Sequence, residues 1–340
     1  MTVESRRTRR ESRRPGATAR PAGVKPLLNK LPLTEVLSPE GVEMIHRASM
    51  RLLKEVGVLI VDYPPAAETF KQNSATVEWV EKEVTYPNGD TAQVKGHLVR
   101  LDEGTLMNFI KQAPPTFTLL ARNPANNLSV GGRTTIFAPV YGPPFVGSLD
   151  WGRRPATIED FRNFARLTYM AEHMHHNGGT LVEPNDVDVK ERHLDMLMAH
   201  ITLSDKSFMG SVTHADNARD TVTMSRILFG EEAISQNPAT LSLINASSPM
   251  RFDDRMFGAL EVYARARQAV LVTPFLIAGA MSPSTMAATL AQQNAEALFG
   301  ICYAQMLNPG TPCVYGSFLA NIDMKSGAPL RTVAFNLGSS

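Results

Sequence analysis

Six side chains that could bind a small molecule stand at the end of short apolar runs of the sequence or just after them. They are one carboxylate, three aromatic rings, one imidazole and one amide: Glu183, Tyr141, Phe145, Tyr315, His214 and Asn245. No dense set of metal ligands accompanies them, and no lysine stands beside them to form a Schiff base. Their types therefore favour the binding of an organic molecule, and we expect no metal site.

The apolar runs that precede these residues have the length of strands and alternate with amphipathic segments. The predicted strands cover 134–140, 179–183, 207–212, 240–245, 270–274 and 312–315. The predicted helices cover 157–171, 188–203, 215–229, 252–268 and 284–307. Strand starts recur every ~30–45 residues, which is the spacing of repeated βα units, and nearly unbroken apolar strands are typical of a parallel sheet buried on both faces.

Repeated βα units form either a doubly wound sheet or a barrel. Because no Gly-x-Gly-x-x-Gly turn follows the first strand, we expect a TIM-type (β/α)8 barrel, to which residues 134–329 contribute. Such a barrel needs about 250 residues, so we expect one or two units to be missing and a sheet edge to be exposed after 312–315. In a parallel barrel the active site lies at the carboxyl ends of the strands, where all six selected residues stand.

The residues before the predicted barrel follow other patterns. Residues 31–133 combine a helix start at Ser38, a β-hairpin over 76–101, a short helix over 102–112 and further strand at 117–130, which predicts a mixed α/β flank. Residues 1–30 hold nine Lys and Arg against two Glu and few large apolar residues, so we expect a disordered basic tail. Residues 330–340 are expected to form an irregular tail.

Several short segments resemble the trimethylamine methyltransferase family, including its members that lack pyrrolysine. They are ARNP at 121–124, GG at 131–132, ASSPM at 246–250, GAMSPST at 279–285, QNAE at 293–296, GTPCVYG at 310–316 and IDMKSGAP at 322–329. The resemblance implies a TIM-barrel enzyme that moves a methyl group from a methylated amine to cobalt. The cobalt belongs to a corrinoid (cobalamin) that a separate partner protein carries, so the resemblance implies no cofactor bound covalently to this chain.

The resemblance also implies roles for the six selected residues. An enzyme of this type must hold a methylated ammonium, exclude water and align one methyl group with the cobalt. Aromatic faces and a nearby carboxylate suit an ammonium that has no N–H donor. We therefore expect Tyr141, Phe145 and Tyr315 to wall a cage and Glu183 to supply the counter-charge. The remaining two selected residues, the imidazole and the amide, would be further substrate contacts, and the catalytic residues stay unknown.

The substrate and the activity leave alternatives open. Because the sequence contains no pyrrolysine, the resemblance favours a quaternary amine such as glycine betaine over trimethylamine. Members of the family are longer than this chain, which departs from their pattern after Pro329. An inactive, C-terminally truncated fragment of such an enzyme therefore remains an alternative, as does another TIM-barrel enzyme of the lyase or aldolase type.

The histidines of the chain invite a metal interpretation that their positions do not favour. His173, His175 and His176 precede a predicted strand, at the end of the barrel away from the active site, so we expect them to cap a helix or face solvent. His193 and His200 lie seven residues apart, which is not the i, i+4 spacing of a helical zinc pair.

Two acids near the site segments are expected to be structural. Asp253 follows a Ser-Ser-Pro turn and should begin a helix, where a negative charge is favoured. Glu296 lies within a long apolar helix, where it should accept a hydrogen bond from a buried donor. Neither belongs to the predicted site.

The overall composition limits the classes of function. The formal net charge is +1 over 340 residues, so outside the basic tail there is no general reason to bind nucleic acid. Two cysteines, Cys302 and Cys313, form no disulfide framework, and no run of 18 apolar residues predicts a membrane span. We expect a cytoplasmic homo-oligomer whose partners are a corrinoid protein and a small methylated amine.

Overall fold

The N-terminal flank is a four-stranded sheet with three helices. The computed structural model describes residues 25–32, 34–85, 90–323, 325–326 and 329–330. The strands β2 (Val58–Ile60), β4 (Thr91–Arg100) and β3 (Thr76–Thr85) are antiparallel neighbours, and β11 (Arg251–Phe252) joins β2 in parallel from a later part of the chain. The helices are α2 (Pro39–Arg51), α3 (Pro64–Gln72) and α4 (Glu103–Ile110). The predicted hairpin over 76–101 is confirmed, although turn residues 87–89 lie outside the described part.

Side-chain caps begin two of these helices where the sequence predicts them. The Ser38 hydroxyl accepts a hydrogen bond from the Gly41 amide at 3.2 Å, and Pro39 occupies the first helical position of α2. The Asp102 carboxylate accepts from the Thr105 amide at 3.0 Å and caps α4. After α2, a π-helical turn (Leu52–Val56) ends at Gly57, whose positive φ and closeness to β4 leave no room for a side chain.

Two small antiparallel pairs connect the flank to the rest of the molecule. The strands β5 (Thr116–Leu119) and β6 (Leu128–Gly131) form a hairpin around a 3-10 turn (Pro124–Asn126). The strand β1 (Leu27–Leu28) pairs with β7 (Thr134–Thr135). The prediction of a disordered segment 1–30 is therefore wrong for residues 27–29, because the backbone of 27–28 pairs with β7 and the Asn29 amide donates to the Arg133 carbonyl; residues 1–24 lie outside the described part.

Three of the predicted barrel strands form a parallel sheet. Its order is β10 (Leu241–Ile244), β12 (Ala269–Val272) and β14 (Cys313–Tyr315), and a parallel bridge between Phe208 and Thr240 extends it by one more segment. The strands predicted at 240–245, 270–274 and 312–315 are confirmed. Beyond β12 and β14 the chain continues into β13 (Phe275–Ala278) and β15 (Phe318–Ile322), which are also parallel, and β16 (Pro329–Leu330) adds antiparallel to β15.

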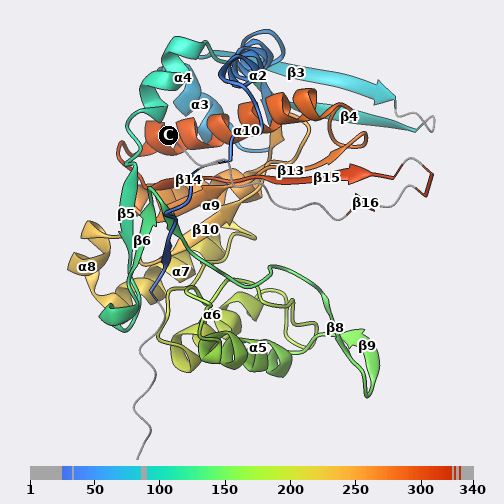
Figure 1. Ribbon diagram of the computed structural model, residues 1–340. Coiled ribbons are helices and arrows are strands. Elements are labelled where there is room, and N and C mark those ends of the chain that lie inside the picture. Colours follow the sequence, from blue (N-terminus) through green and yellow to red (C-terminus); the bar gives the residue numbers. More distant parts are fainter. Residues whose placement is uncertain (1–24, 33, 86–89, 324, 327–328, 331–340) are drawn as a thin grey trace, which may run out of the picture.

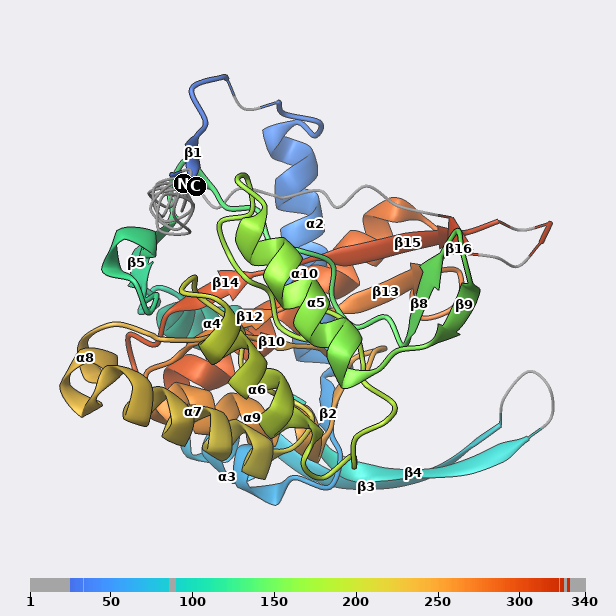
Figure 2. The ribbon, with the colours of Figure 1, turned by 90° about the horizontal axis from the view of Figure 1, so that it is seen from below.

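The helices between these strands match their predicted positions within a few residues. They are α5 (Ile158–Met170), α6 (Arg192–Leu203), α7 (Ala215–Phe229), α9 (Asp254–Arg265) and α10 (Met286–Leu307), with α8 (Glu231–Gln236) as an unpredicted short addition. Between β7 and α5, the strands β8 (Phe145–Ser148) and β9 (Gly152–Pro155) form a hairpin that projects from the body of the molecule (Figures 1 and 2).

The first three predicted barrel strands are wrong as regular strands, and in 207–212 only the isolated bridge at Phe208 is formed. In 134–140 only β7 is a strand; Phe137 donates its amide to the ring of His175, and Pro139 has no amide to donate. In 179–183 the His200 ring takes the Gly179 carbonyl that a neighbouring strand would otherwise use. Side chains thus replace part of the ladder in both segments.

These two segments nevertheless lie side by side in the order that the sequence predicts. The Gly142 amide donates to the Thr180 carbonyl at 2.7 Å, and the Asn177 amide donates to the Ser207 carbonyl at 2.8 Å. Further along the same pair of segments, the Met209 amide donates to the Gly178 carbonyl at 2.8 Å. The segments around Gly142, Gly178 and Phe208 therefore run in the same direction, and the last of them joins the parallel sheet at Thr240. The described strands do not close into a barrel.

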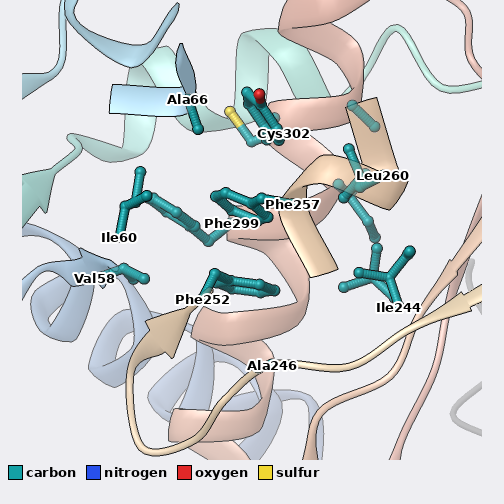
Figure 3. Packing of buried hydrophobic residues seen from close by; sticks show 14 of the residues in the cluster. Val58, Ile60, Ala66, Ile244, Ala246, Phe252, Phe257, Leu260, Phe299 and Cys302 are labelled. Atoms are coloured by element: carbon teal, nitrogen blue, oxygen red, sulfur yellow. The ribbon is translucent and has the colours of Figure 1, made fainter. Parts of the chain in front are cut away.

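The main core lies around α10, which is buried along most of its length between the flank and the parallel sheet (Figure 1). Phe252, Phe257 and Phe299 stack face to face inside it (Figure 3), with ring centroids 4.3 Å apart for the first two. This packing fixes β11, α9 and α10 relative to one another. None of the described helices is both long and apolar enough to cross a membrane.

Candidate functional site

Alternation along the parallel strands decides which side chains line a possible site. Ile244, Val272 and Tyr315 stand in one row across β10, β12 and β14 and pack into the main core. Residues one position earlier or later in these strands face the other side. That opposite face is partly exposed, and its carboxyl end carries Asn245 at the exit of β10.

A threonine hydroxyl and a glycine continue the row of Asn245 across the sheet. Thr273 follows β12 and Gly316 follows β14, and a Cβ built on Gly316 would lie 2.0 Å from the Thr273 hydroxyl oxygen. The Thr273 hydroxyl is buried and has no hydrogen-bond partner among the described residues. The Thr273 side chain therefore already fills the place that a side chain at position 316 would need, which is why a glycine stands there.

Tyr141 and Glu183 are brought together at the carboxyl ends of the two irregular segments. Two backbone bonds join the loops that carry them, from the Gly142 amide to the Thr180 carbonyl and from the Glu183 amide to the Pro143 carbonyl. The Tyr141 ring lies directly on Gly179, where a Cβ would come within 2.6 Å of its Cε2 atom. Tyr141 is 39% exposed as a whole, but burial of its hydroxyl and the charge of Glu183 raise the pKa of that hydroxyl, although a hydrogen bond with Thr180 opposes them.

An arginine that the sequence analysis did not select completes this group. Arg192 is the first residue of α6, and its Nη1 atom donates to Glu183 Oε1 at 2.5 Å. The Arg192 side chain is 15% exposed and that of Glu183 is 32% exposed. The Nε–H donor of Arg192 is buried and has no partner among the described residues. An aromatic ring, a carboxylate and a guanidinium thus share one corner of the molecule.

Tyr315 does not belong to this group. Its hydroxyl donates to Gln293 and Asn294 of α10 at 3.2 and 3.1 Å, and burial raises its pKa to about 12. The side chain therefore points into the helix layer, away from the face that carries Asn245. The predicted association of Tyr315 with Tyr141 and Glu183 in one cage is not found, because strand alternation places the Tyr315 ring on the core side.

Phe145 and His214 make contacts of their own. The Phe145 ring begins β8 and is covered by the guanidinium of Arg153, with 3.9 Å between its central carbon and the ring centroid. His214 caps α7, where its Nδ1 atom accepts from the Asp216 amide at 3.2 Å. Phe145 therefore pairs with a cation of its own hairpin, and His214 has a structural role at a helix start.

The histidines near the site are neutral structural groups. His200 accepts a hydrogen bond from the Asn177 amide group and donates to the Gly179 carbonyl, both at 2.7 Å, so it supports the glycine beneath the Tyr141 ring. His175 and His176 are buried, and their Nδ1 atoms accept from backbone amides at 2.9 Å. The predicted exposure of these two is therefore wrong; burial lowers the pKa of His176 to about 3 and that of His200 to about 4.

The acids that we expect to be structural have that role. Glu296 is fully buried and accepts from the Ser248 hydroxyl at 2.5 Å, the Met250 amide at 2.7 Å and the Gln292 side chain at 2.9 Å. These bonds fix the loop that leaves the carboxyl end of β10. Asp253 caps α9 by accepting from the Met256 amide at 3.0 Å. Within the described ranges, no three His, Cys, Asp or Glu residues are grouped as metal ligands.

Comparison with known proteins identifies the family. Residues 4–334 match the family model described as trimethylamine methyltransferase (MTTB). The chain belongs to this family. It is 42% identical over 299 residues to a glycine betaine methyltransferase of Desulfitobacterium hafniense. The matched region covers 88% of this chain and 59% of that protein. It is 26% identical over 315 residues to a proline betaine:corrinoid methyltransferase of Eubacterium limosum, covering 89% and 59% of the two chains.

More distant relatives are also named as methylamine methyltransferases. A trimethylamine methyltransferase, MttB2, of Methanosarcina mazei is 24% identical over 90% of this chain and 60% of its own length. Among solved structures, the monomethylamine methyltransferase of Methanosarcina barkeri overlaps 82% of this chain and 60% of its own, with 12% identity and a TM-score of 0.45. That score is too low to establish a shared fold. The chain spans about 60% of the length of the curated relatives it matches.

Proposed function

We propose that this chain carries the amine site of a methyltransferase that moves a methyl group from a quaternary amine to the cobalt of a corrinoid on a separate protein. The observation that carries the proposal is the Glu183–Arg192 ion pair beside the Tyr141 ring, at the carboxyl ends of adjacent segments. The names of the betaine methyltransferases among the relatives support it.

The charges of this group match a betaine. Glycine betaine and proline betaine each carry a quaternary ammonium and a carboxylate. The Tyr141 face and Glu183 would bind the ammonium, and Arg192, which has an unused Nε–H donor, would bind the carboxylate. Trimethylamine has no carboxylate, so it would leave the guanidinium without a partner in the ligand. Recognition would therefore favour the zwitterion.

The methyl-transfer reaction requires this chain to bind and orient the amine, and it requires no proton transfer. When a quaternary ammonium loses a methyl group, the electron pair of the broken C–N bond stays on nitrogen, and the leaving amine is neutral. The corrinoid of the docked partner supplies the methyl acceptor. Tyr141 and Glu183 would hold the ammonium so that one methyl group faces the partner, and the surrounding apolar groups would exclude water.

The remaining expectations complete the proposal. We propose that residues 134–329 form part of a (β/α)8 barrel, with 31–133 as its flank. The parallel order of β10, β12 and β14 supports this arrangement. The corrinoid would stay on its own carrier with no covalent link to this chain, and the protein would work in the cytoplasm as a homo-oligomer.

Methylation of free cob(I)alamin tests the proposed function directly. The full chain is incubated with chemically reduced cobalamin and one of four amines: glycine betaine, proline betaine, trimethylamine or dimethylamine. The visible spectrum of the cobalt reports methylation. We expect turnover with at least one betaine and less with trimethylamine and dimethylamine. If no amine methylates the cobalamin, the proposed function is wrong.

A further inference from the structure

One cavity of the described residues lies away from the proposed amine site. It has a volume of about 280 Å³ and lies between the N-terminal arm, the loop around the 3-10 turn, and the residues before Phe208. Thr134, His175 and Lys206, which line it, stand at the amino-terminal ends of three neighbouring segments. Tyr141 and Glu183 stand at the opposite ends of two of these segments, so the cavity is separate from the site that they form.

Two cations face this cavity. Lys206 is 8% exposed, and its ammonium donates to the carbonyls of Thr168 and Ala171 at the end of α5, at 3.0 and 3.1 Å. An ammonium has three N–H donors, so one remains for another acceptor. Lys25, on the N-terminal arm, is exposed at the border of the same cavity.

A buried histidine adds a donor that has no acceptor. His175 is 4% exposed and lines the cavity. Its Nδ1 atom accepts from the Phe137 amide, so in the neutral ring the proton is on Nε2. The Lys25 carbonyl is close enough to act as a weak acceptor that raises the pKa of the ring, but its geometry does not complete a hydrogen bond with Nε2. A buried donor without an acceptor costs stability unless a ligand or water binds it.

The rest of the lining is uncharged: four residues are polar, and Pro26, Ala125, Leu128 and Met174 are apolar. Asn127 uses its carbonyl oxygen to accept from the Ala121 amide, which leaves its NH₂ group as a donor. Ser129 and Thr134 add hydroxyl groups. None of the described lining residues carries a carboxylate, but Asp205, which bonds to Asn126 and Asn123, is close enough for its charge to act on the Lys206 ammonium. The cavity therefore offers donors and positive charge on several sides.

We propose that this cavity binds a small tetrahedral oxyanion of the phosphate class, held by Lys206, Lys25 and the Nε2–H of His175. Several donors that converge from different elements suit an oxyanion better than an organic cation, which the two lysines would repel. The bound anion would bridge the N-terminal arm to the amino-terminal ends of the neighbouring segments. The site is independent of the proposed amine site and of its substrate.

Binding of inorganic phosphate to the full chain tests the proposal. Isothermal titration calorimetry and thermal unfolding are carried out with phosphate, sulfate or acetate, with sodium chloride at equal ionic strength as the reference. We expect saturable phosphate binding and a higher melting temperature than chloride gives. Sulfate should compete with phosphate, and acetate should bind more weakly because it presents fewer oxygens.

Variants separate this site from general charge effects. Lys206→Met should weaken phosphate binding roughly 10- to 100-fold, because it removes a charge-assisted hydrogen bond from a buried group. Since Lys206 also caps α5, Lys25→Met is the second variant: it should weaken binding several-fold without changing the melting temperature in chloride. Lys71→Met on α3 makes the same change of net charge and should bind phosphate like the parent. Phosphate that stabilises no more than chloride, or equal binding by the parent, Lys25→Met and Lys206→Met, overturns the proposal.

Discussion

Arg192 donates a 2.5 Å hydrogen bond to Glu183 across the loop that joins an irregular segment to α6. The two residues are nine positions apart, and Tyr141, from another part of the chain, is close enough for the charge of Glu183 to raise the pKa of its hydroxyl. The carboxylate already has a cation next to it. A second cation without a carboxylate would have to compete with Arg192, whereas a zwitterion would give the guanidinium a new anion.

Replacing Glu183 by Gln should therefore weaken betaine binding. The Glu183 carboxylate is partly exposed, so loss of its charge should cost about 1 kcal/mol of binding free energy, which corresponds to a roughly fivefold higher Kd. Calorimetric titration with glycine betaine measures this change. The matched control is Glu232→Gln on α8, an exposed acid that should bind betaine like the parent. Unchanged betaine affinity in Glu183→Gln would remove this carboxylate from the site.

Gly179→Ala should disturb the same group without changing any charge. The new methyl group would lie 2.6 Å from the Tyr141 ring and 2.9 Å from Cβ of Met209, so the ring must move away from its place beside Glu183. We expect betaine binding to weaken at least about 10-fold, because a displaced ring loses its contact with the ammonium. Gly147→Ala on β8, where the nearest atom is 3.8 Å away, should bind betaine normally. Equal affinities of the two variants would show that the Tyr141 ring does not touch the ligand.

The helices of this fold could be predicted because their signals are local. Ser38, Asp102 and Asp253 each begin a helix with a side-chain cap, and a cap and an apolar period of 3.6 residues are visible in a short stretch of sequence. The strands β10, β12 and β14 are short, continuous apolar runs and were found for the same reason. The segments at 134–140 and 179–183 are similar apolar runs, but the rings of His175 and His200 bond to backbone groups that a neighbouring strand would use. No local sequence pattern predicts these bonds.

The candidate site was predicted only in part because its geometry depends on which face a side chain takes. Tyr141 and Glu183 were selected from their positions after apolar runs, and the structure places them together. Tyr315 was selected by the same criterion, yet β14 is apolar on both faces, so the sequence could not show that this tyrosine points toward α10. Arg192 was missed because eight residues of loop separate it from Glu183, and no periodic pattern links them.

Acid should destabilise the protein through two buried histidines. The folded-state pKa values of His176 and His200, about 3 and about 4, lie below the ordinary value of 6.5 because burial disfavours the charged ring. Above pH 6.5 both rings are neutral in the folded and the unfolded chain. As the pH falls below 6.5 the unfolded chain takes up protons that the folded chain does not, so the free energy of unfolding decreases, by about 2 kcal/mol per histidine at pH 5.

Urea unfolding at pH 7.5 and pH 5.0 measures this dependence. His200→Gln should unfold more easily than the parent at pH 7.5, since it loses the bond to Gly179, but it should lose less stability between the two pH values. His173→Gln, at an exposed position, should keep the pH dependence of the parent. An equal loss of stability in the parent and His200→Gln would show that this ring does not carry the effect.

Tyr315→Phe tests whether the core face of the parallel sheet, which carries Tyr315, takes part in ligand binding or whether only the opposite face, which carries Asn245, does so. The change removes the hydroxyl that donates to Gln293 and Asn294 and keeps the ring in the core, so the free energy of unfolding should fall by about 1 kcal/mol. Betaine affinity should stay within about twofold of the parent, because the ring faces α10 rather than Asn245. Asn245→Ala is the matched comparison: it removes a partly buried polar group from the opposite face and should weaken betaine binding more than it lowers stability. Urea unfolding and calorimetric titration of the two variants give both quantities. If Tyr315→Phe weakens binding as strongly as Asn245→Ala does, the tyrosine contacts the ligand and the assignment of the two faces is wrong.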